Sequence, residues 1–232
     1  EKFKAQLGVE DELDVYRKLD VDKIAWLGIP YKGVVLKDPN EHRDVDHWGV
    51  KFEKIKANND AEYGEVSFHP LLELNSVEAL EAYPWPNPDD FDYKTAAAEA
   101  KALAQEFVTL GPWISIFEVY CAMRSLEEAL MDTIAAPEFL HAALDKIADV
   151  QGEMARRFLE AADGAIDMLF ISDDVGSQNS LIMSPDTFNE FIFPRLKTWC
   201  DMAHEYGAKV FFHTDGASEL LIPRLIDAGV DV

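Results

Sequence analysis

Short apolar runs alternate with longer helical stretches in the second half of the chain. Residues 168–171 and 209–212 are mainly apolar, and each run turns polar at its C-terminal end. The stretch 185–206 between them is predicted to be a helix, because Ser184 suits the N-cap and Gly207 follows the last turn. Strand, helix and strand joined by short loops predict a parallel sheet, either open or closed into a barrel.

The same alternation extends to both sides of this unit. Residues 113–117 form an apolar run that ends at Glu118, which predicts an earlier strand of the same sheet. A long helix is predicted over 137–162, where proline at the first position suits the first turn. A shorter helix is expected over 218–228, and a further strand opens at 229–232. Chemistry in such α/β folds sits at the C-terminal ends of the strands.

The first half of the chain is less regular. Residues 10–19 are predicted to form a helix, and the short apolar run 23–29 favours a strand. Residues 49–55 and 65–68 alternate loosely, which predicts a β-hairpin whose long polar tip contains Asn58-Asn59-Asp60.

These patterns divide the chain into two parts. Residues 1–112 form a helix and hairpin region with the start of the sheet, and residues 113–232 form regular β/α units. A strand that opens at 229–232 needs a neighbour, because an unpaired edge leaves backbone groups bare. We therefore expect the chain to be a fragment whose remaining strands lie beyond Val232.

Composition narrows the classes of partner. Among 232 residues, acidic side chains exceed basic ones enough to give a net charge of −23. Nucleic-acid binding is not expected, because phosphate contacts need a basic face. No apolar run approaches the ~20 residues that span a bilayer, and Cys121 and Cys200 lie far apart in different elements. We therefore expect a cytoplasmic protein with no membrane partner.

One candidate metal site follows the strand at 209–212. Side chains two residues apart on a strand share a face, so His213 and Asp215 can point together. An imidazole and a carboxylate would supply half of a zinc site. The spacing alone does not distinguish a metal site from a hydrogen-bonded structural pair.

Three carboxylates are candidates for acid–base catalysis. Asp173 and Asp174 follow the strand at 168–171, where one of them can instead cap the following turn. Glu118 closes an apolar strand, and burial there would raise its pKa. A hydrogen bond to a core amide would explain Glu118 equally well.

Three further side chains are candidates for substrate binding. Tyr120 and Arg124 follow the strand end at Glu118, and Gln178 lies in the loop after 168–171. A glutamine there can bind a substrate amide or carboxylate, or it can be a solvated loop residue.

Several motifs resemble the uroporphyrinogen decarboxylase family. They are DDVGSQ at 173–178, IMSPDTF at 182–188, FIFPRLK at 191–197, KVFFHTDG at 209–216 and LIDAGVDV at 225–232. Earlier segments are similar too, namely DHWGV at 46–50, HPL at 69–71, YPWP at 83–86 and FE at 117–118. The resemblance implies a (β/α)8 TIM barrel, here apparently truncated, with its site at the strand C-termini. The same superfamily holds methyltransferases that work with corrinoid proteins.

Two departures from the family patterns bear on the activity. Decarboxylases carry an RQAGR segment that binds substrate carboxylates, and this sequence has none. The methyltransferases bind zinc through a His-x-Cys pair and a later cysteine. His213 matches that pattern, Asp215 stands at the first cysteine, and the later ligand would lie beyond Val232.

The resemblance therefore favours methyl transfer from a small methylated substrate to a corrinoid on a partner protein. Zinc held by a carboxylate suits Lewis-acid activation of an ether or alcohol oxygen. Uroporphyrinogen decarboxylation without a metal is the second hypothesis, and a catalytically inactive binding barrel is the third. A homodimer is left open.

Overall fold

A parallel four-stranded sheet forms the centre of the protein. The computed structural model describes residues 2–34, 43–56 and 62–232. The strands follow the order β1-β5-β6-β7, with β1 at Ile24–Trp26, β5 at Val108–Ile114, β6 at Met168–Ser172 and β7 at Lys209–His213. All three pairings are parallel. The predicted α/β fold with a parallel sheet is thus confirmed.

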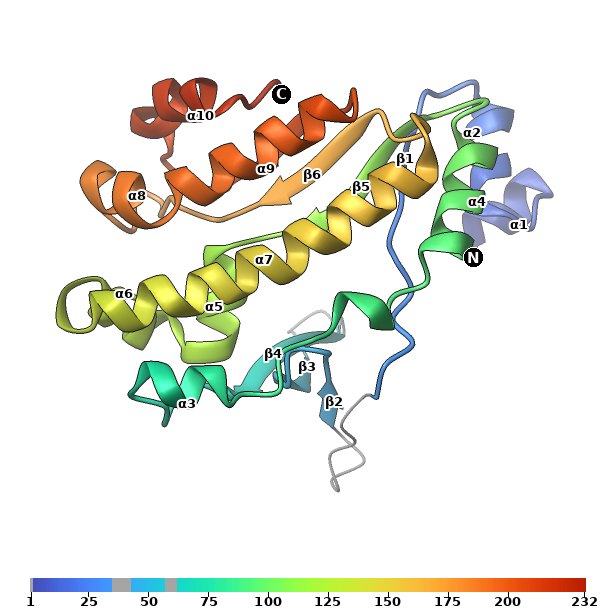
Figure 1. Cartoon of the computed structure of the whole chain (residues 1–232). Helices are drawn as coiled ribbons and strands as arrows, with labels where there is room; N and C mark the ends of the chain where they lie inside the picture. The colour runs from blue at the N-terminus through green and yellow to red at the C-terminus, as the bar shows by residue number, and fades with distance from the viewer. Residues whose placement is uncertain (1, 35–42, 57–61) are drawn as a thin grey trace.

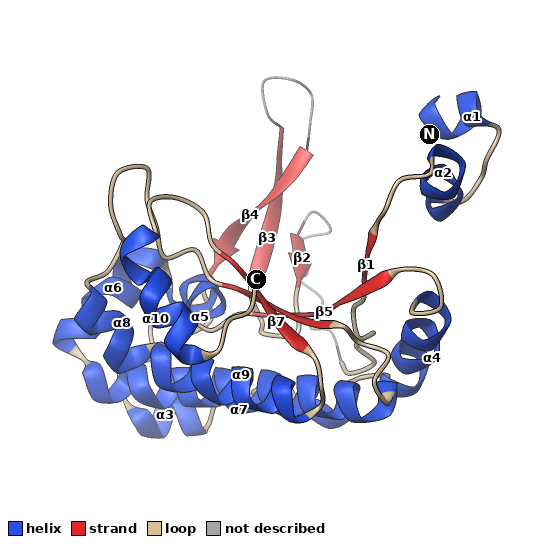
Figure 2. Ribbon diagram, turned by 90° about the horizontal axis from the view of Figure 1, so that it is seen from above, coloured by secondary structure: helices blue, strands red, loops and turns tan. Residues whose placement is uncertain are grey.

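Helices precede, connect and follow these strands. They are α1 Lys2–Leu7, α2 Glu12–Leu19, α3 Val77–Glu81, α4 Tyr93–Leu103, α5 Phe117–Arg124, α6 Leu126–Ala135, α7 Pro137–Ala162, α8 Pro185–Phe191, α9 Phe193–Glu205 and α10 Ile222–Ala228, with short 3-10 turns at Pro88–Asp90 and Glu219–Leu221. Figures 1 and 2 show α7 and α9 running together along the same side of the sheet. Among the described residues, no helix has the length and apolarity needed to cross a bilayer.

Helix α7 shows why the sequence folds this way. Leu140, Leu144, Ile147, Ala155 and Phe158 recur at helical spacing, and all five are fully buried. Such a stripe gives the helix one apolar face, which packs into the core. The predicted bounds 137–162 agree with α7 as observed.

The strand predicted at 113–117 differs in the structure. Strand β5 begins at Val108 and ends at Ile114, so Glu118 lies in the first turn of α5 and does not close a strand. Gly111 and Pro112 interrupt the apolar pattern and hide the start of β5 from sequence reasoning. A Cβ at Gly111 would lie 2.1 Å from the carbonyl oxygen of Leu27. Glycine is therefore required where the chain leaving β1 approaches β5.

A second sheet carries the predicted hairpin. Strands β3 (Lys51–Lys56) and β4 (Glu62–Phe68) are antiparallel, and β2 (Arg43–Val45) pairs with β3. The predicted tip, Asn58-Asn59-Asp60, lies outside the described residues. Figure 2 shows the hairpin on the side of the central sheet away from α7 and α9.

The segment after α10 continues the sheet. The backbone N–H of Val232 donates to the oxygen of Val210 over 3.1 Å, and the N–H of Phe212 donates to the oxygen of Val232 over 2.9 Å. Residues 230–232 thus lie in hydrogen-bonded contact with β7, where a further strand was expected.

Candidate active site

The loops after β6 and β7 bring a histidine and two carboxylates together. Nε2 of His213 lies 3.8 Å from Oδ1 of Asp174 and 3.7 Å from Oδ1 of Asp215. One ligand atom from each of the three residues falls within 4.8 Å of the others. All three side chains are at least 44% exposed, so a substrate can reach them.

Backbone contacts hold this cluster in place. Ser172 pairs with His213 in the register of β6 and β7, which sets the two strand ends level. The backbone N–H of Asp215 donates to Oδ1 of Asp174 over 2.9 Å and ties the two loops together. One nitrogen and two carboxylate oxygens suit zinc, which accepts both donor types and keeps a position open in catalytic sites. Sequence reasoning proposed only His213 and Asp215 as ligands, and the structure places Asp174 beside them as a third candidate.

Asp173 has a different place from its neighbour. Its carboxylate is fully buried and accepts from Ser115 Oγ (2.7 Å) and from the backbone N–H groups of Ile116, Phe117 and Glu118 (3.1, 2.8 and 2.9 Å). Burial raises the pKa of Asp173 to about 6, and the four donors oppose that rise. Asp173 therefore anchors the N-terminus of α5 and is enclosed by donors. Of the two roles that the sequence left open, acid–base catalysis and capping a turn, the buried position of Asp173 favours a structural one.

Glu118 stands beside the cluster. Its Oε2 accepts from Ser172 Oγ over 3.3 Å, so the first turn of α5 meets the end of β6. Burial raises the pKa of Glu118 above its ordinary value, and the negative charges of Asp173 and Asp174 raise it further. A carboxyl group in this state keeps more of its proton near neutral pH, which suits a general acid.

Two predicted substrate-binding residues lie in the core instead. The guanidinium of Arg124 donates to both oxygens of Asp132 and to the carbonyl oxygens of Leu71, Leu72 and Leu74. The Tyr120 hydroxyl donates to Asp132 Oδ2 over 2.5 Å. Both side chains are buried, so the structure places them in the core and not at the open site where substrate binding was predicted. The third, Gln178, is exposed in the loop after β6.

A cavity that sequence reasoning missed adjoins Glu118. It has a volume of about 550 Å³ and lies between the hairpin and the start of α5. Its lining includes Phe52, Val66, Trp113 and Glu118. These residues come from separate segments of the chain, so no local sequence motif predicts the cavity.

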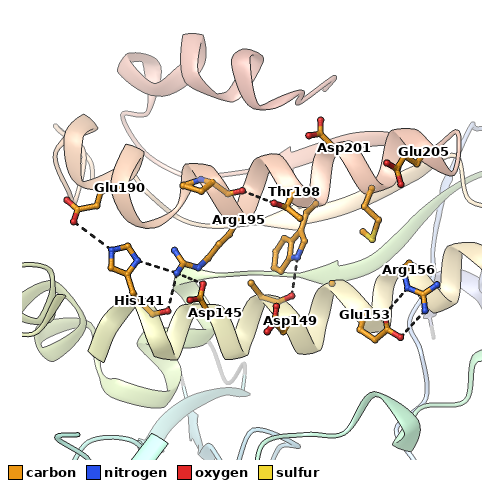
Figure 3. Close-up of a pocket in the computed structure, with 15 residues that line it drawn as sticks. His141, Asp145, Asp149, Glu153, Arg156, Glu190, Arg195, Thr198, Asp201 and Glu205 are labelled. Atoms are coloured by element: carbon orange, nitrogen blue, oxygen red, sulfur yellow. Dashed lines mark hydrogen bonds and ion pairs between the residues drawn. The ribbon is translucent and has the colours of Figure 1, made fainter. Parts of the chain in front are cut away.

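A larger hollow of about 960 Å³ lies elsewhere, between α7 and α9 (Figure 3). Its polar side chains pair with one another, since Arg195 forms an ion pair with Asp145 and Arg156 forms one with Glu153. None of its lining residues belongs to the cluster of Asp174, His213 and Asp215 or to the turn that carries Glu118. Size alone therefore does not identify the active site.

The wall of the smaller cavity gives a testable pH dependence. The His47 ring packs 5.3 Å from Tyr31 and 5.5 Å from Phe91, measured between ring centroids, and burial lowers the pKa of His47 to about 4. The unfolded chain takes up this proton near pH 6.5, so stability is lost as pH falls from about 6.5 towards 4. We expect His47→Phe to remove roughly 1–2 kcal/mol of acid destabilisation, measured by urea unfolding at pH 7 and pH 4.5. An identical loss in wild type and variant would contradict it.

A comparison with models of protein families shows which family the chain belongs to. The model of the family described as "Uroporphyrinogen decarboxylase (URO-D)" matches residues 59–232, which is most of the chain. The chain belongs to the uroporphyrinogen decarboxylase family. The family resemblance found in the sequence is therefore confirmed, and with it membership of a family of enzymes.

Solved structures extend this family assignment to the fold. A methyltransferase from Methanosarcina mazei is similar, with a TM-score of 0.53 and 19% sequence identity. The match covers 77% of this chain and 51% of the methyltransferase. The chain therefore spans about half of the methyltransferase's length. The fold is that of the family's TIM barrel, as predicted. No curated protein sequence matches the chain.

Proposed function

We propose that this family member transfers a methyl group from a small methylated substrate to an acceptor, in the manner of the corrinoid-dependent branch. The observation that carries the proposal is the cluster of Asp174, His213 and Asp215, whose ligand atoms lie within 4.8 Å. The cluster follows the C-terminal ends of β6 and β7, and barrel enzymes have their active sites at the C-terminal ends of the strands. The similar solved structure is a methyltransferase, which favours methyl transfer over decarboxylation.

The residues present fit a zinc ion. Asp174, His213 and Asp215 would hold it, and zinc would supply Lewis-acid polarisation of the oxygen that carries the methyl group. Two carboxylate ligands make the site harder than a thiolate site, which suits an ether or alcohol oxygen. The corrinoid acceptor is proposed to reside on a separate partner protein.

Glu118 is proposed as the general acid. When the methyl–oxygen bond breaks, the methyl group passes to the acceptor and the departing oxygen takes the proton of Glu118. Ser172 orients the carboxyl by donating to Oε2 over 3.3 Å. Asp173 positions the whole turn, because it binds the backbone N–H groups from which α5 starts.

Charge argues against the decarboxylase activity that gives the family its name. Uroporphyrinogen carries several carboxylates, and burying each of them without a cation costs several kcal/mol. The cluster contributes two carboxylates, Asp174 and Asp215, and Glu118 lies beside it, whereas the guanidinium of Arg124 is enclosed in the core. An acidic site of this kind repels a polycarboxylate.

The test uses the full-length protein, free cob(I)alamin as acceptor, and methanol, methylamine and methoxybenzene as donors. Methylcobalamin formation is followed by absorbance. We expect Glu118→Gln to lower kcat by roughly 10²–10⁴-fold for an oxygen donor, because the amide cannot give up a proton. Glu127→Gln removes an exposed carboxyl from the first turn of α6 and should leave kcat unchanged.

The pH profile adds a second readout. Because the pKa of Glu118 is raised, wild-type activity should persist further towards neutral pH than an ordinary glutamic acid allows, and then fall as pH rises. Glu118→Gln should lack that limb. No methyl transfer from any donor, together with carbon dioxide release from uroporphyrinogen, would replace this proposal with decarboxylation. A protein that shows neither methyl transfer nor decarboxylation would support the third hypothesis, a catalytically inactive binding barrel.

A further inference from the structure

The cavity beside Glu118 is lined mainly by apolar side chains. Phe52 and Val66 are direct cross-strand partners of β3 and β4, so they share a face of the hairpin, and both line the cavity. Trp113 of β5 and Val119 of α5 line it from the central sheet and its helix. At about 550 Å³, the volume falls within the range of small-molecule sites.

The polar groups in its wall are few and mostly engaged. Asp46 Oδ1 accepts from the backbone N–H groups of Trp48 and Val50, both over 2.9 Å. Nδ1 of His69 lies 2.8 Å from the carbonyl oxygen of Ala122, which fixes the proton on Nδ1. Burial also raises the pKa of Asp46 to about 6 and lowers that of His47 to about 4, so the cavity disfavours charge on both residues.

Glu118 joins this cavity to the metal-ligand cluster. It lines the cavity, and its Oε2 is bonded to Ser172, whose register partner on β7 is His213. A molecule that fills the cavity therefore contacts Glu118, whose hydrogen-bond partner Ser172 is level with His213. The methoxy group of an aromatic ether seated there would lie where Glu118 can protonate its oxygen.

We propose that the cavity bounded by Phe52, Val66 and Trp113 binds the neutral aromatic body of the substrate and presents its methyl-bearing oxygen to Glu118. This inference rests on the proposed methyl transfer and names its substrate class, a small aromatic methyl ether. The aromatic walls favour a flat ring through edge and stacking contacts. An anion is disfavoured by Glu118 and Asp174, and a small cation would lose its hydration against apolar walls.

Binding is measured without turnover, by saturation-transfer NMR and calorimetry on the full-length protein. The probes are methoxybenzene, 2-methoxyethanol and tetramethylammonium. We expect methoxybenzene to bind at least about tenfold more tightly than the other two, because only it buries a ring. Equal binding of 2-methoxyethanol, tighter binding of tetramethylammonium, or no binding of methoxybenzene at its solubility limit would overturn the proposal.

Two neighbouring substitutions on β4 locate the site. Val66→Phe places a ring inside the cavity, whereas Ser67→Phe adds the same bulk at the adjacent exposed position, which does not line it. We expect Val66→Phe to weaken methoxybenzene binding at least about tenfold and Ser67→Phe to leave it unchanged. Trp113→Ala removes a partly exposed wall residue and should also weaken binding, which keeps the test decisive if Val66→Phe fails to fold. Unchanged binding in both cavity variants would overturn the inference.

A double comparison separates this inference from the proposed function. Val66→Phe should lose methoxybenzene and keep its zinc, while His213→Ala should lose zinc and keep methoxybenzene. A protein that binds methoxybenzene as expected but transfers no methyl group retains the cavity assignment and refutes methyl transfer. A protein that transfers methyl groups from methanol while ignoring methoxybenzene retains the function and refutes the aromatic substrate class.

Discussion

Replacing His213 with alanine is expected to strip the metal from the full-length protein and abolish methyl transfer. Wild type should contain about one zinc per chain, and the variant should bind zinc at least a hundredfold more weakly, since it loses a direct ligand. The remaining groups, Asp174 and Asp215, are carboxylates at least half exposed, and water competes for the ion there. Elemental analysis and calorimetric zinc titration measure the change.

A matched histidine provides the control. His141 lies on α7 and lines the hollow between α7 and α9, where its Nε2 is 3.7 Å from Oε1 of Glu190. The His141→Ala variant should keep both zinc and activity. Asp174→Asn should also weaken zinc binding, because the structure adds Asp174 to the ligand set predicted from sequence. A His213→Ala variant that melts earlier but retains its zinc would make His213 a structural residue. An active wild type without stoichiometric metal would end the zinc proposal.

Arg124→Ala is expected to be the most destabilising of the substitutions considered. Removing the guanidinium leaves the buried Asp132 carboxylate with only the Tyr120 hydroxyl as a side-chain donor, and it takes the Arg124 donor from three carbonyl oxygens. Breaking a buried ion pair in this way costs about 3–5 kcal/mol, which lowers the melting temperature by roughly 10 °C in a chain of this size. Thermal unfolding followed by circular dichroism measures it.

Arg156→Ala supplies the surface comparison. Arg156 is 40% exposed and pairs with Glu153 and Glu160 one turn away, so its loss should cost no more than about 1 kcal/mol. The double variant Arg124→Ala/Asp132→Ala should be less unstable than the sum of its single variants, because neither charge is then left alone. An Arg124→Ala protein with unchanged melting but weakened substrate binding would restore the role predicted from sequence.

The case of Asp173 and Asp174 shows where sequence reasoning stops. The sequence places both at the end of one strand and assigns them the same candidate role. In the structure, one carboxylate turns inward to the start of α5 and the other remains at the open cluster with His213. Successive side chains point in opposite directions in extended backbone, and only the packing of α5 decides which of them is buried.

Local pattern alone determined much of the fold. Apolar runs closed by polar residues located β6 and β7, and cap residues and the prolines at helix starts located α7 and the start of α8. The single helix predicted over 185–206 is two helices, because the helix breaks at Ile192 between α8 and α9. These signals are local, because helix and strand periodicity and capping involve residues only a few positions apart. The candidate ligands His213 and Asp215 came from the same source.

The tertiary structure alone decided what those residues meet. It closed β1 against β5 across Gly111, turned Arg124 into the core, and brought Asp174 to His213 from a loop 39 residues earlier in the chain. It also formed the cavity between Val66 and Trp113, which no sequence window contains. Such contacts depend on how separate elements pack. The residue type at one position does not specify which residues from distant parts of the chain it will contact.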